Sequence, residues 1–557
     1  MGQAREPRVR SPYLRLGGLG AVAVLSVGIW TSAGAFQIKT GSEDLELRWD
    51  NTVKYNIGMR VEDQNGAILK NANADDGDRN FDRWSLITNR FDILSELDFV
   101  YKRGYGFRVS AAGWYDNAYE NLDNDSVATS NRIRNGQQAL GLSTVAEHQL
   151  KGPYGELLDA FVFGKVNLGP VPVNVKVGRH TVYWGESMIT NQAISYSQAP
   201  IDAAKGAAVP GTELKELFRP LAQVSATAQL TDTLSLALQQ FLEWEPYRLT
   251  ESGGYFSASD MFMDGGESLV LVPGVFFLRH GEDQEPEGWK SRGVALRWSP
   301  GWLDGTLGFY YRRFTDMIPS QLILDIPRGR FHVTYADDID LYGVSASRKV
   351  LGTTVGAEVS YRRNMPLAAD PFVNAVNPAL QLPDDGDILG PKGNTVHGVV
   401  NVLGLLKKSL LWDAGSWLTE LNYTTYTKVT SDPNNLFTGR SGNHTLGAAD
   451  KHAVALNVQF SPQWFQVLPG MDLTMPLFWG GGIRNTAAVP GGSAKDAGSY
   501  SAGLSLDIYQ KYTVSAVYAG YYGRFKKDAT GAATEVNSGN ALLKDRDNIT
   551  VTLKATF

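Results

Sequence analysis

Ionisable side chains gather in the stretch from residue 179 to residue 216, and their types suit a polar passage. Three stand near its start and three near its end: Arg179, His180, Glu186, Glu213, Lys215 and Glu216. Charges that face a narrow passage of low dielectric constant select solutes by charge. The alternative is that Arg179 and Glu186 only fasten this stretch to its surroundings. The sequence therefore predicts a constriction or an anchored loop in this part of the chain.

A second pattern has the spacing of a cation site. Asp76, Asp78, Asn80 and Asp82 alternate as calcium ligands would, but Gly77 is misplaced for an EF-hand loop and no Glu closes the site. An acidic surface turn is the simpler interpretation. The seven His residues are scattered without the spacing of metal ligands. We therefore predict no metal and no other cofactor.

The chain contains few candidates for covalent catalysis. It has no cysteine, which excludes disulfides, thiolate metal sites and cysteine nucleophiles. A lipase built on a barrel would need a base, for example His397, beside a Ser of a neighbouring strand on the outer wall. No motif marks such a pair, so we predict no catalytic residue and no enzyme.

The elements that must position these residues have the composition of strands and turns. The chain of 557 residues contains 59 Gly and is rich in Phe, Tyr and Trp. After residue 35 the longest apolar run is 269–278, which Pro273 and Gly274 interrupt. This run is shorter than the roughly 20 residues of a membrane-spanning helix, and it forms either a loop core or an apolar surface that receives a solute. A membrane could then be crossed only by strands closed into a barrel, because every backbone polar group must be paired there.

Strict alternation predicts those strands. In residues 45–60, polar and apolar side chains alternate with one exception, Asn51. About 18 strands are expected, with 16 as the alternative, and short connections alternate with long ones. The expected strands begin near residues 45, 88, 106, 157, 172, 221, 234, 291, 305, 337, 353, 394, 416, 451, 471, 498, 513 and 547. This pattern predicts an all-β fold, one antiparallel transmembrane β-barrel over residues 36–557 with short periplasmic turns and long extracellular loops.

Charged residues on the inner face of these strands are expected to line the lumen. If such a side chain faced lipid at mid-membrane, it would destabilise the barrel by about 2 to 4 kcal/mol. The candidates are Arg108, Glu358, Arg362, Glu420 and Lys554. They either contact the solute or pair with one another. The third long connection, 183–220, contains Leu214, Leu217 and Phe218 at helical spacing behind Thr212. We therefore expect a short helix packed on the barrel wall, within a loop that narrows the lumen.

The two ends of the chain predict its location. Residues 1–35 combine four Arg, an apolar stretch and an Ala-Gly-Ala sequence, which is typical of a secretory signal cleaved between Ala35 and Phe36. Because this segment carries four Arg and one Glu, cleavage would lower the net charge from −6 to −9, which argues against a nucleic-acid partner. The last strand alternates up to Phe557, and a terminal aromatic residue resembles the signal read by the barrel-assembly machinery. We therefore predict the bacterial outer membrane, with its lipid and that machinery as partners.

Five short motifs carry a resemblance to a known family. They are residues 76–81 (DGDRNF), 177–180 (VGRH), 184–187 (WGES), 210–217 (PGTELKEL) and 358–363 (EVSYRR). Together they resemble the proteobacterial domain of unknown function 1302 over nearly the whole mature chain. The resemblance implies a porin-like outer-membrane protein, in a family with no agreed substrate and no catalytic residues to carry over.

Three classes of function follow. The first is a channel for uptake or export of small organic molecules, hydrophobic ones included, with residues 183–220 as the constriction. The second is a non-conducting partner of an envelope or export complex, whose lumen is plugged by its own loops. The third is the outer-membrane lipase considered above. The prediction includes no identity for the solute and no oligomeric state.

Overall fold

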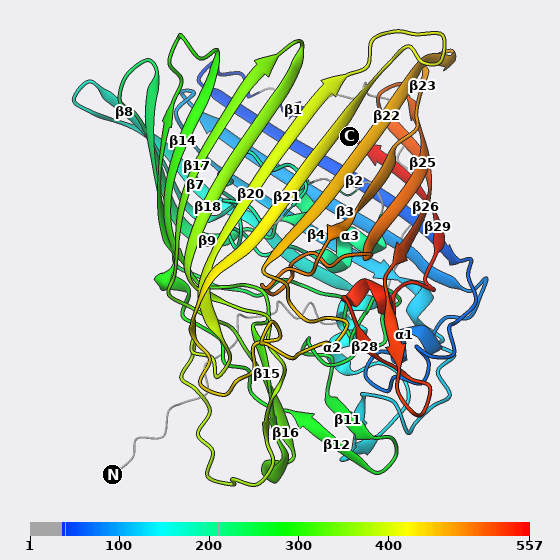
Figure 1. The fold of residues 1–557 in the computed structure, drawn as a ribbon. Coiled ribbons are helices and arrows are strands. Elements are labelled where there is room, and N and C mark those ends of the chain that lie inside the picture. Colours follow the sequence, from blue (N-terminus) through cyan, green and yellow to red (C-terminus); the bar gives the residue numbers. More distant parts are fainter. Residues whose placement is uncertain (1–35, 39, 191, 210–211, 213) are drawn as a thin grey trace.

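Eighteen strands close into one antiparallel barrel in the part of the chain that the computed structural model describes, residues 36–38, 40–190, 192–209, 212 and 214–557 (Figure 1). The strands are β2 (Leu45–Arg60), β3 (Leu86–Tyr101), β4 (Tyr105–Asp116), β7 (Tyr154–Leu168), β8 (Val171–His180), β9 (Leu221–Gln229), β10 (Leu234–Phe241), β13 (Arg292–Trp298), β14 (Gly305–Phe314), β17 (Ile339–Val350), β18 (Thr353–Pro366), β20 (Lys392–Leu405), β21 (Ala414–Ser431), β22 (His452–Leu468), β23 with β24 (Met471–Thr474 and Leu477–Arg484), β25 (Gly498–Ile508), β26 (Tyr512–Tyr522) and β29 (Asn548–Thr556). The barrel closes where β29 pairs with β2. β23 and β24 count as one spanning strand because both pair with β22 and β25.

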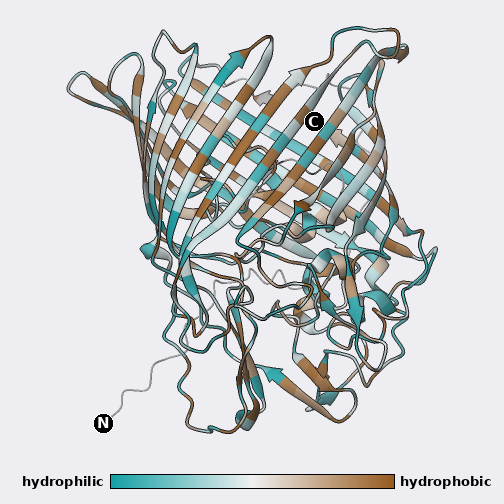
Figure 2. Ribbon diagram, viewed as in Figure 1, coloured by the Kyte–Doolittle hydropathy of each residue, from teal (hydrophilic) through white to brown (hydrophobic). Residues whose placement is uncertain are grey.

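Each strand turns an apolar face outward and a polar face inward. On β2, Tyr55 and Ile57 are exposed on the outside, whereas Lys54 and Asn56 are buried on the inside. Successive side chains of a strand point to opposite faces, so alternation in the sequence becomes two different surfaces. Figure 2 shows hydrophobic and hydrophilic residues alternating along the strands. The outer face suits lipid, and the inner face suits water and a polar solute.

The structure confirms the predicted fold class and the strand number of 18. Every expected strand is present, and each begins within three residues of its predicted position. The short turns lie at one end of the barrel and the long loops at the other (Figure 1). None of the described helices is long and apolar enough to span a membrane.

Phe36 and Phe557 both lie beside the strand pair that closes the barrel. Phe36, the predicted first residue after cleavage, begins β1 (Phe36–Ile38), which pairs with β2, and Ala35 lies outside the described residues. Phe557 follows β29, and its backbone exchanges hydrogen bonds of 2.8 and 2.9 Å with Asn51. Its role as an assembly signal stays a prediction.

The long loops build a cap of small elements over one end of the barrel (Figure 1). Its helices are α1 (Asp76–Arg79), η1 (Asn117–Tyr119), α2 (Thr144–Leu150), η2 (Gly288–Lys290), η3 (Ile326–Arg328) and η4 (Gly539–Leu542). Its strands are β5 (Ile133–Arg134), β6 (Gln137–Gln138), β11 (Ser268–Val272), β12 (Phe276–His280), β15 (Gln321–Asp325), β16 (Arg330–Thr334), β19 (Phe372–Asn374), β27 (Phe525–Lys527) and β28 (Ala533–Val536). Leu269 and Leu278 of the predicted apolar run pack with Leu324 and Phe331, whereas Val275 at the hairpin tip is exposed. The run is therefore partly a loop core and partly an exposed tip.

The acidic turn predicted at the surface is wrong, because the cap buries most of it. Asp76 and Asp78 are buried and bind different partners. Asp78 pairs with Arg60 at 2.7 Å, and Asp76 accepts a hydrogen bond of 2.9 Å from the backbone of Asn131. A buried guanidinium needs a carboxylate beside it, and this requirement draws the turn inward. Among the described residues, no group of three or more His, Cys, Asp and Glu side chains could hold a metal ion.

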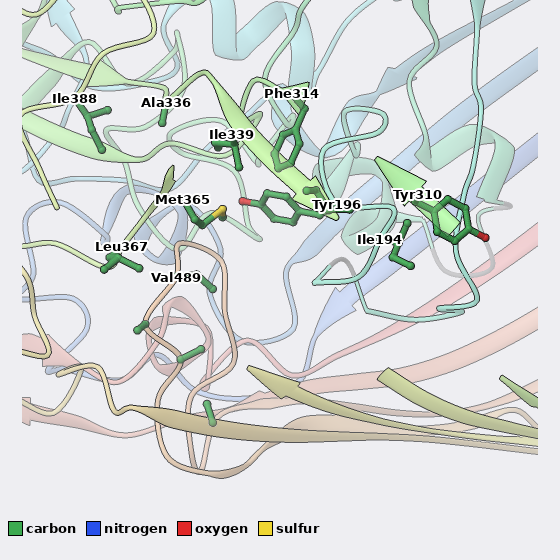
Figure 3. Close-up of a cluster of buried hydrophobic side chains, with 14 of the residues drawn as sticks. Ile194, Tyr196, Tyr310, Phe314, Ala336, Ile339, Met365, Leu367, Ile388 and Val489 are labelled. Carbon is green, nitrogen blue, oxygen red and sulfur yellow. The ribbon is translucent and has the colours of Figure 1, made fainter. Parts of the chain in front are cut away.

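A large apolar cluster fixes the loop that enters the barrel. Ile194 and Tyr196 of this loop pack against Tyr310 and Phe314 of β14 and Met365 of β18 (Figure 3). All five side chains are buried. This packing positions the loop against the inner wall and so defines the space that remains in the lumen.

Candidate functional site

The connection from β8 to β9, residues 181–220, folds into the barrel and is called the lumen loop below. It contains α3 (Ala203–Ala208), which Figure 1 shows inside the barrel, and α4 (Leu214–Leu217). Asp202 caps α3 by accepting a hydrogen bond of 2.8 Å from the backbone of Lys205. α4 confirms the predicted helix, but the hydroxyl of Thr212 donates back to the carbonyl of Val209 at 2.5 Å.

Two buried carboxylates of the wall hold the first half of the lumen loop by its backbone. Glu420 of β21 accepts hydrogen bonds from the N–H groups of Met188 (2.7 Å) and Thr190 (2.6 Å). Glu358 of β18 accepts from the N–H groups of Glu186 (2.5 Å) and Ile194 (2.7 Å). Hydrogen bonds to an ionised acceptor are about twice as strong as neutral ones. These two lumen candidates therefore bind the loop.

Two buried guanidinium groups hold the adjoining carbonyls. Arg312 of β14 donates to the carbonyls of Ile194 at 2.9 Å and Ser197 at 2.9 Å. Arg362 of β18 donates to Ala193 at 2.9 Å and lies 4.2 Å from the centre of the Tyr196 ring. Donors and acceptors of the loop backbone are thus both satisfied by charges of the wall, which keeps the loop in one conformation.

The second half of the lumen loop is fixed by side-chain ion pairs. Glu216 of α4 contacts Lys54 of β2 at 2.5 Å and Lys205 of α3 at 3.2 Å, and all three side chains are buried. Asp202 pairs with Arg248 at 2.7 Å. Breaking a buried pair by removing one partner leaves an uncompensated charge, so these contacts hold the helices firmly.

The constriction residues predicted at the start of the loop form ion pairs and hydrogen bonds with neighbouring segments. Arg179 pairs with Glu243 at 2.5 Å and with Glu245 at 3.1 Å. His180 is buried and shares a hydrogen bond of 2.7 Å with Ser225. The carboxylate of Glu186 accepts from Ser345 at 3.0 Å. Glu213 and the side chain of Lys215 lie outside the described residues.

One cavity in the lumen, here the charged chamber, has a volume of about 810 Å³. Its wall comes from β3, β4, β7 and β8, and its far side is the lumen loop. Arg108, a predicted lumen residue, contacts Asp98 at 3.0 Å and Asp159 at 3.1 Å there. Aromatic and apolar side chains complete the lining, among them Phe161, Phe163, Tyr183, Met188, Phe218 and Tyr247.

A second cavity, here the neutral chamber, has a volume of about 530 Å³. Its wall comes from β21, β22, β24 and β25, and none of the described residues that line it carries a formal charge. Hydrogen-bonding side chains and glycines predominate, among them Thr190, Asn422, Thr424, Asn457, Gly480, Gly482, Ser499 and Asn540. Ile189, Thr190 and Ile201 line both chambers, so this edge of the lumen loop lies between them.

Some functional residues were missed by sequence reasoning, and one was misplaced. Arg312 was not predicted as a lumen residue, because Arg313 follows it and interrupts the alternation of polar and apolar residues in β14. His397 faces the lumen, is buried, and contacts the hydroxyls of Thr395 at 2.9 Å and Thr424 at 3.2 Å. The catalytic pair considered for the outer wall is therefore wrong.

Lys554 lies away from both chambers. Its ladder partner on β2 is Lys54, the residue that pairs with Glu216. This position puts Lys554 beside the attachment of α4 to the wall and outside the lining of either cavity.

A closed barrel with an apolar outer face, a polar inner face and a loop folded into its lumen defines a porin-like protein of the bacterial outer membrane. The model of the family "Protein of unknown function (DUF1302)" matches residues 16–557, and the chain belongs to that family.

Among the solved structures that match the chain are three from Pseudomonas aeruginosa and Acinetobacter baumannii. Pseudomonas aeruginosa OpdK with vanillate and Acinetobacter baumannii OccAB4 each show 10% identity and a TM-score of 0.38, over 92% of this chain and 98% of theirs. Pseudomonas aeruginosa OccD3 shows 10% identity and a TM-score of 0.40, over 94% of this chain and 93% of its own. No curated protein matches the chain.

Proposed function

We propose that this protein is an outer-membrane channel for small organic molecules, with the lumen loop as its constriction. The observation that carries the proposal is the pair of chambers that share one edge of that loop, formed by Ile189, Thr190 and Ile201. A solute that travels through the lumen would leave one chamber and enter the other past this edge. Cavities of 300 to 1,000 Å³ are of the size that holds small organic ligands.

In this proposal the charged candidates act mainly by holding the constriction in place. Glu358, Arg362 and Glu420 fasten the first half of the loop, and Glu216 fastens the second. The residues that narrow the passage are then the uncharged ones at the shared edge. A rigid edge excludes large solutes, because its backbone cannot move aside without breaking several buried hydrogen bonds.

Single-channel recording of the purified protein in planar bilayers tests the proposal. Ile189→Trp should lower the conductance and Ile201→Gly should raise it, because these side chains face both chambers. Ile57→Trp is the matched control, since Ile57 lies on the outer face of β2 and is exposed there. Equal conductance of the native protein and both lumen variants would place the passage elsewhere.

The second candidate is a non-conducting partner of an envelope or export complex. It is favoured by the apolar cluster around Ile194 and Tyr196, which fills part of the lumen. The same recording separates the two candidates. A native protein that inserts but never conducts would favour this second function over the channel.

A further inference from the structure

We infer that the neutral chamber is a binding site for an uncharged polyhydroxylated solute, a sugar or cyclic polyol, with Asn422 as its specificity-determining residue. This inference rests on the proposed channel and names the class of solute that it would carry. Four observations support it.

The first observation is an amide without partners. Asn422 is 7% exposed, and neither its side-chain oxygen nor its side-chain nitrogen has a hydrogen-bond partner within the described protein. Buried amides are nearly always satisfied, because a lost hydrogen bond to water has to be replaced. Asn422 follows Glu420 on the inner face of β21 and lines the neutral chamber. A ligand in that chamber would supply both missing partners.

The second observation is the register that leaves this amide uncovered. The ladder partners of Asn422 are Val399 on β20 and Ala455 on β22, and neither side chain can form a hydrogen bond. Beyond Ala455 the next residue in the row is Gly482 of β24. The wall next to Asn422 is therefore nearly bare, and the neighbouring strands offer the amide no side-chain hydrogen bond.

The third observation is the number of neutral donors and acceptors. Apart from Asn422, the lining includes the amides of Asn457 and Asn540 and the hydroxyls of Thr190, Thr424 and Ser499. The ring of Phe478 supplies an apolar surface. A sugar ring has hydroxyl groups at its rim and an apolar C–H face, which matches this combination of amides, hydroxyls and one aromatic ring.

The fourth observation is the absence of counter-charge. None of the described lining residues is ionisable, although the neighbouring charged chamber contains Arg108, Asp98 and Asp159. A charged solute would lose hydration in the neutral chamber without gaining an ion pair. An uncharged solute would lose less, and amides and hydroxyls would replace its hydrogen bonds. The chamber therefore discriminates against net charge.

Equilibrium binding to the purified protein, measured by isothermal titration calorimetry in detergent, tests the inference. The probes are glucose and myo-inositol, with gluconate and glucosamine as charged analogues of glucose. At least one neutral probe should bind, and the charged analogues should bind at least about tenfold more weakly. Asn422→Leu should weaken the neutral probe about tenfold, as expected for two lost hydrogen bonds. Asn422→Asp should shift the preference toward glucosamine.

The control is Asn174→Leu, because Asn174 lies on the lumen face of β8 next to Lys176 but lines neither chamber. Circular dichroism establishes that each variant keeps the barrel. The inference fails if no neutral probe binds, if gluconate binds as tightly as glucose, or if folded Asn422→Leu binds normally. Binding can be measured without transport through the barrel. If the protein binds a neutral probe but never conducts, the channel proposal is wrong and the binding site is still supported.

Discussion

The charged chamber and the neutral chamber share an edge of the lumen loop, yet their walls are built from opposite kinds of side chain. In the charged chamber, Arg108 is surrounded by carboxylates that include Asp98 and Asp159. In the neutral chamber, the row that begins at Asn422 continues with Ala455 and Gly482. One wall presents ion pairs, and the other presents backbone and small neutral groups.

The difference teaches that the neutral wall is kept clear by glycine and other small residues, whereas the charged wall keeps large ionised side chains next to one another. A Cβ atom at Gly482 would collide with the backbone oxygen of Ala494, and one at Gly480 would collide with the side chain of Asn457. Glycine at position 482 lets the backbone of Ala494 approach the wall, and residues 491–494 and 497 form a roof over the neutral chamber there. On the charged side, the carboxylates Glu96, Asp98 and Asp159 are tolerated because all three contact Arg108.

The largest effect is expected from removing the boundary between the two chambers. The double variant Glu358→Ala, Glu420→Ala deletes the carboxylates that hold the first half of the lumen loop. Each hydrogen bond to a charged group contributes about 1.5 to 3 kcal/mol, so the loop should leave the wall and single-channel conductance should rise severalfold. Glu147→Ala, at an exposed position of α2, is the control. Unchanged conductance in a folded double variant would mean that the loop does not separate the chambers.

The next effect concerns charge selectivity, which should belong to one chamber only. Arg108→Ala leaves Glu96, Asp98 and Asp159 without the cation that contacts all three. One uncompensated carboxylate attracts a cation at about 4 Å by about 1 kcal/mol in water. The cation-to-anion permeability ratio should therefore rise roughly fivefold. Reversal potentials in a salt gradient measure it. Asn457→Ala in the neutral chamber should leave the ratio unchanged, and an equal shift there would remove the distinction between the two walls.

A smaller effect is expected from adding a side chain to the wall of the neutral chamber. Gly482→Ala places a methyl group against the backbone of Ala494, so it should lower the free energy of unfolding by about 1 to 3 kcal/mol through overpacking. Gly155→Ala on β7 is the matched control, since no atom lies within 4 Å of its added Cβ. Thermal unfolding followed by circular dichroism compares the two. Equal stability of both variants would show that the glycine is dispensable for the roof of the neutral chamber.

The smallest effect is a pH dependence confined to the cap. Burial raises the pKa of Asp75 to about 6 and the pKa of Glu251 to about 7. The folded cap therefore holds protons that the unfolded chain releases near pH 4, so the stability of the cap should fall as pH rises from about 4 to about 7. Hydrogen exchange of residues 61–85 and 242–267, corrected for intrinsic rates, should be faster at about pH 8 than at about pH 5. Binding in the neutral chamber should not change, because none of its described lining residues titrates.

The sequence by itself determined the barrel. Alternation of apolar and polar residues is a local property of each strand, and it reports directly which face meets lipid. For this reason the strand number, the strand positions and the inward direction of Arg108, Glu358 and Glu420 could be predicted without any long-range contact.

Only the tertiary structure decided what the inward residues do. Glu420 binds the backbone of Thr190, which lies 230 positions away in the chain, and no local pattern encodes such a contact. The amide of Asn422 has no side-chain partner on the neighbouring strands because of the register of β21, β22 and β24. A different register would place a larger side chain against it. Asp76 and Asp78 are acidic in sequence but buried in the fold, because distant segments of the cap close over them. Sequence patterns set which face a residue occupies, whereas long-range register and loop packing set its partners.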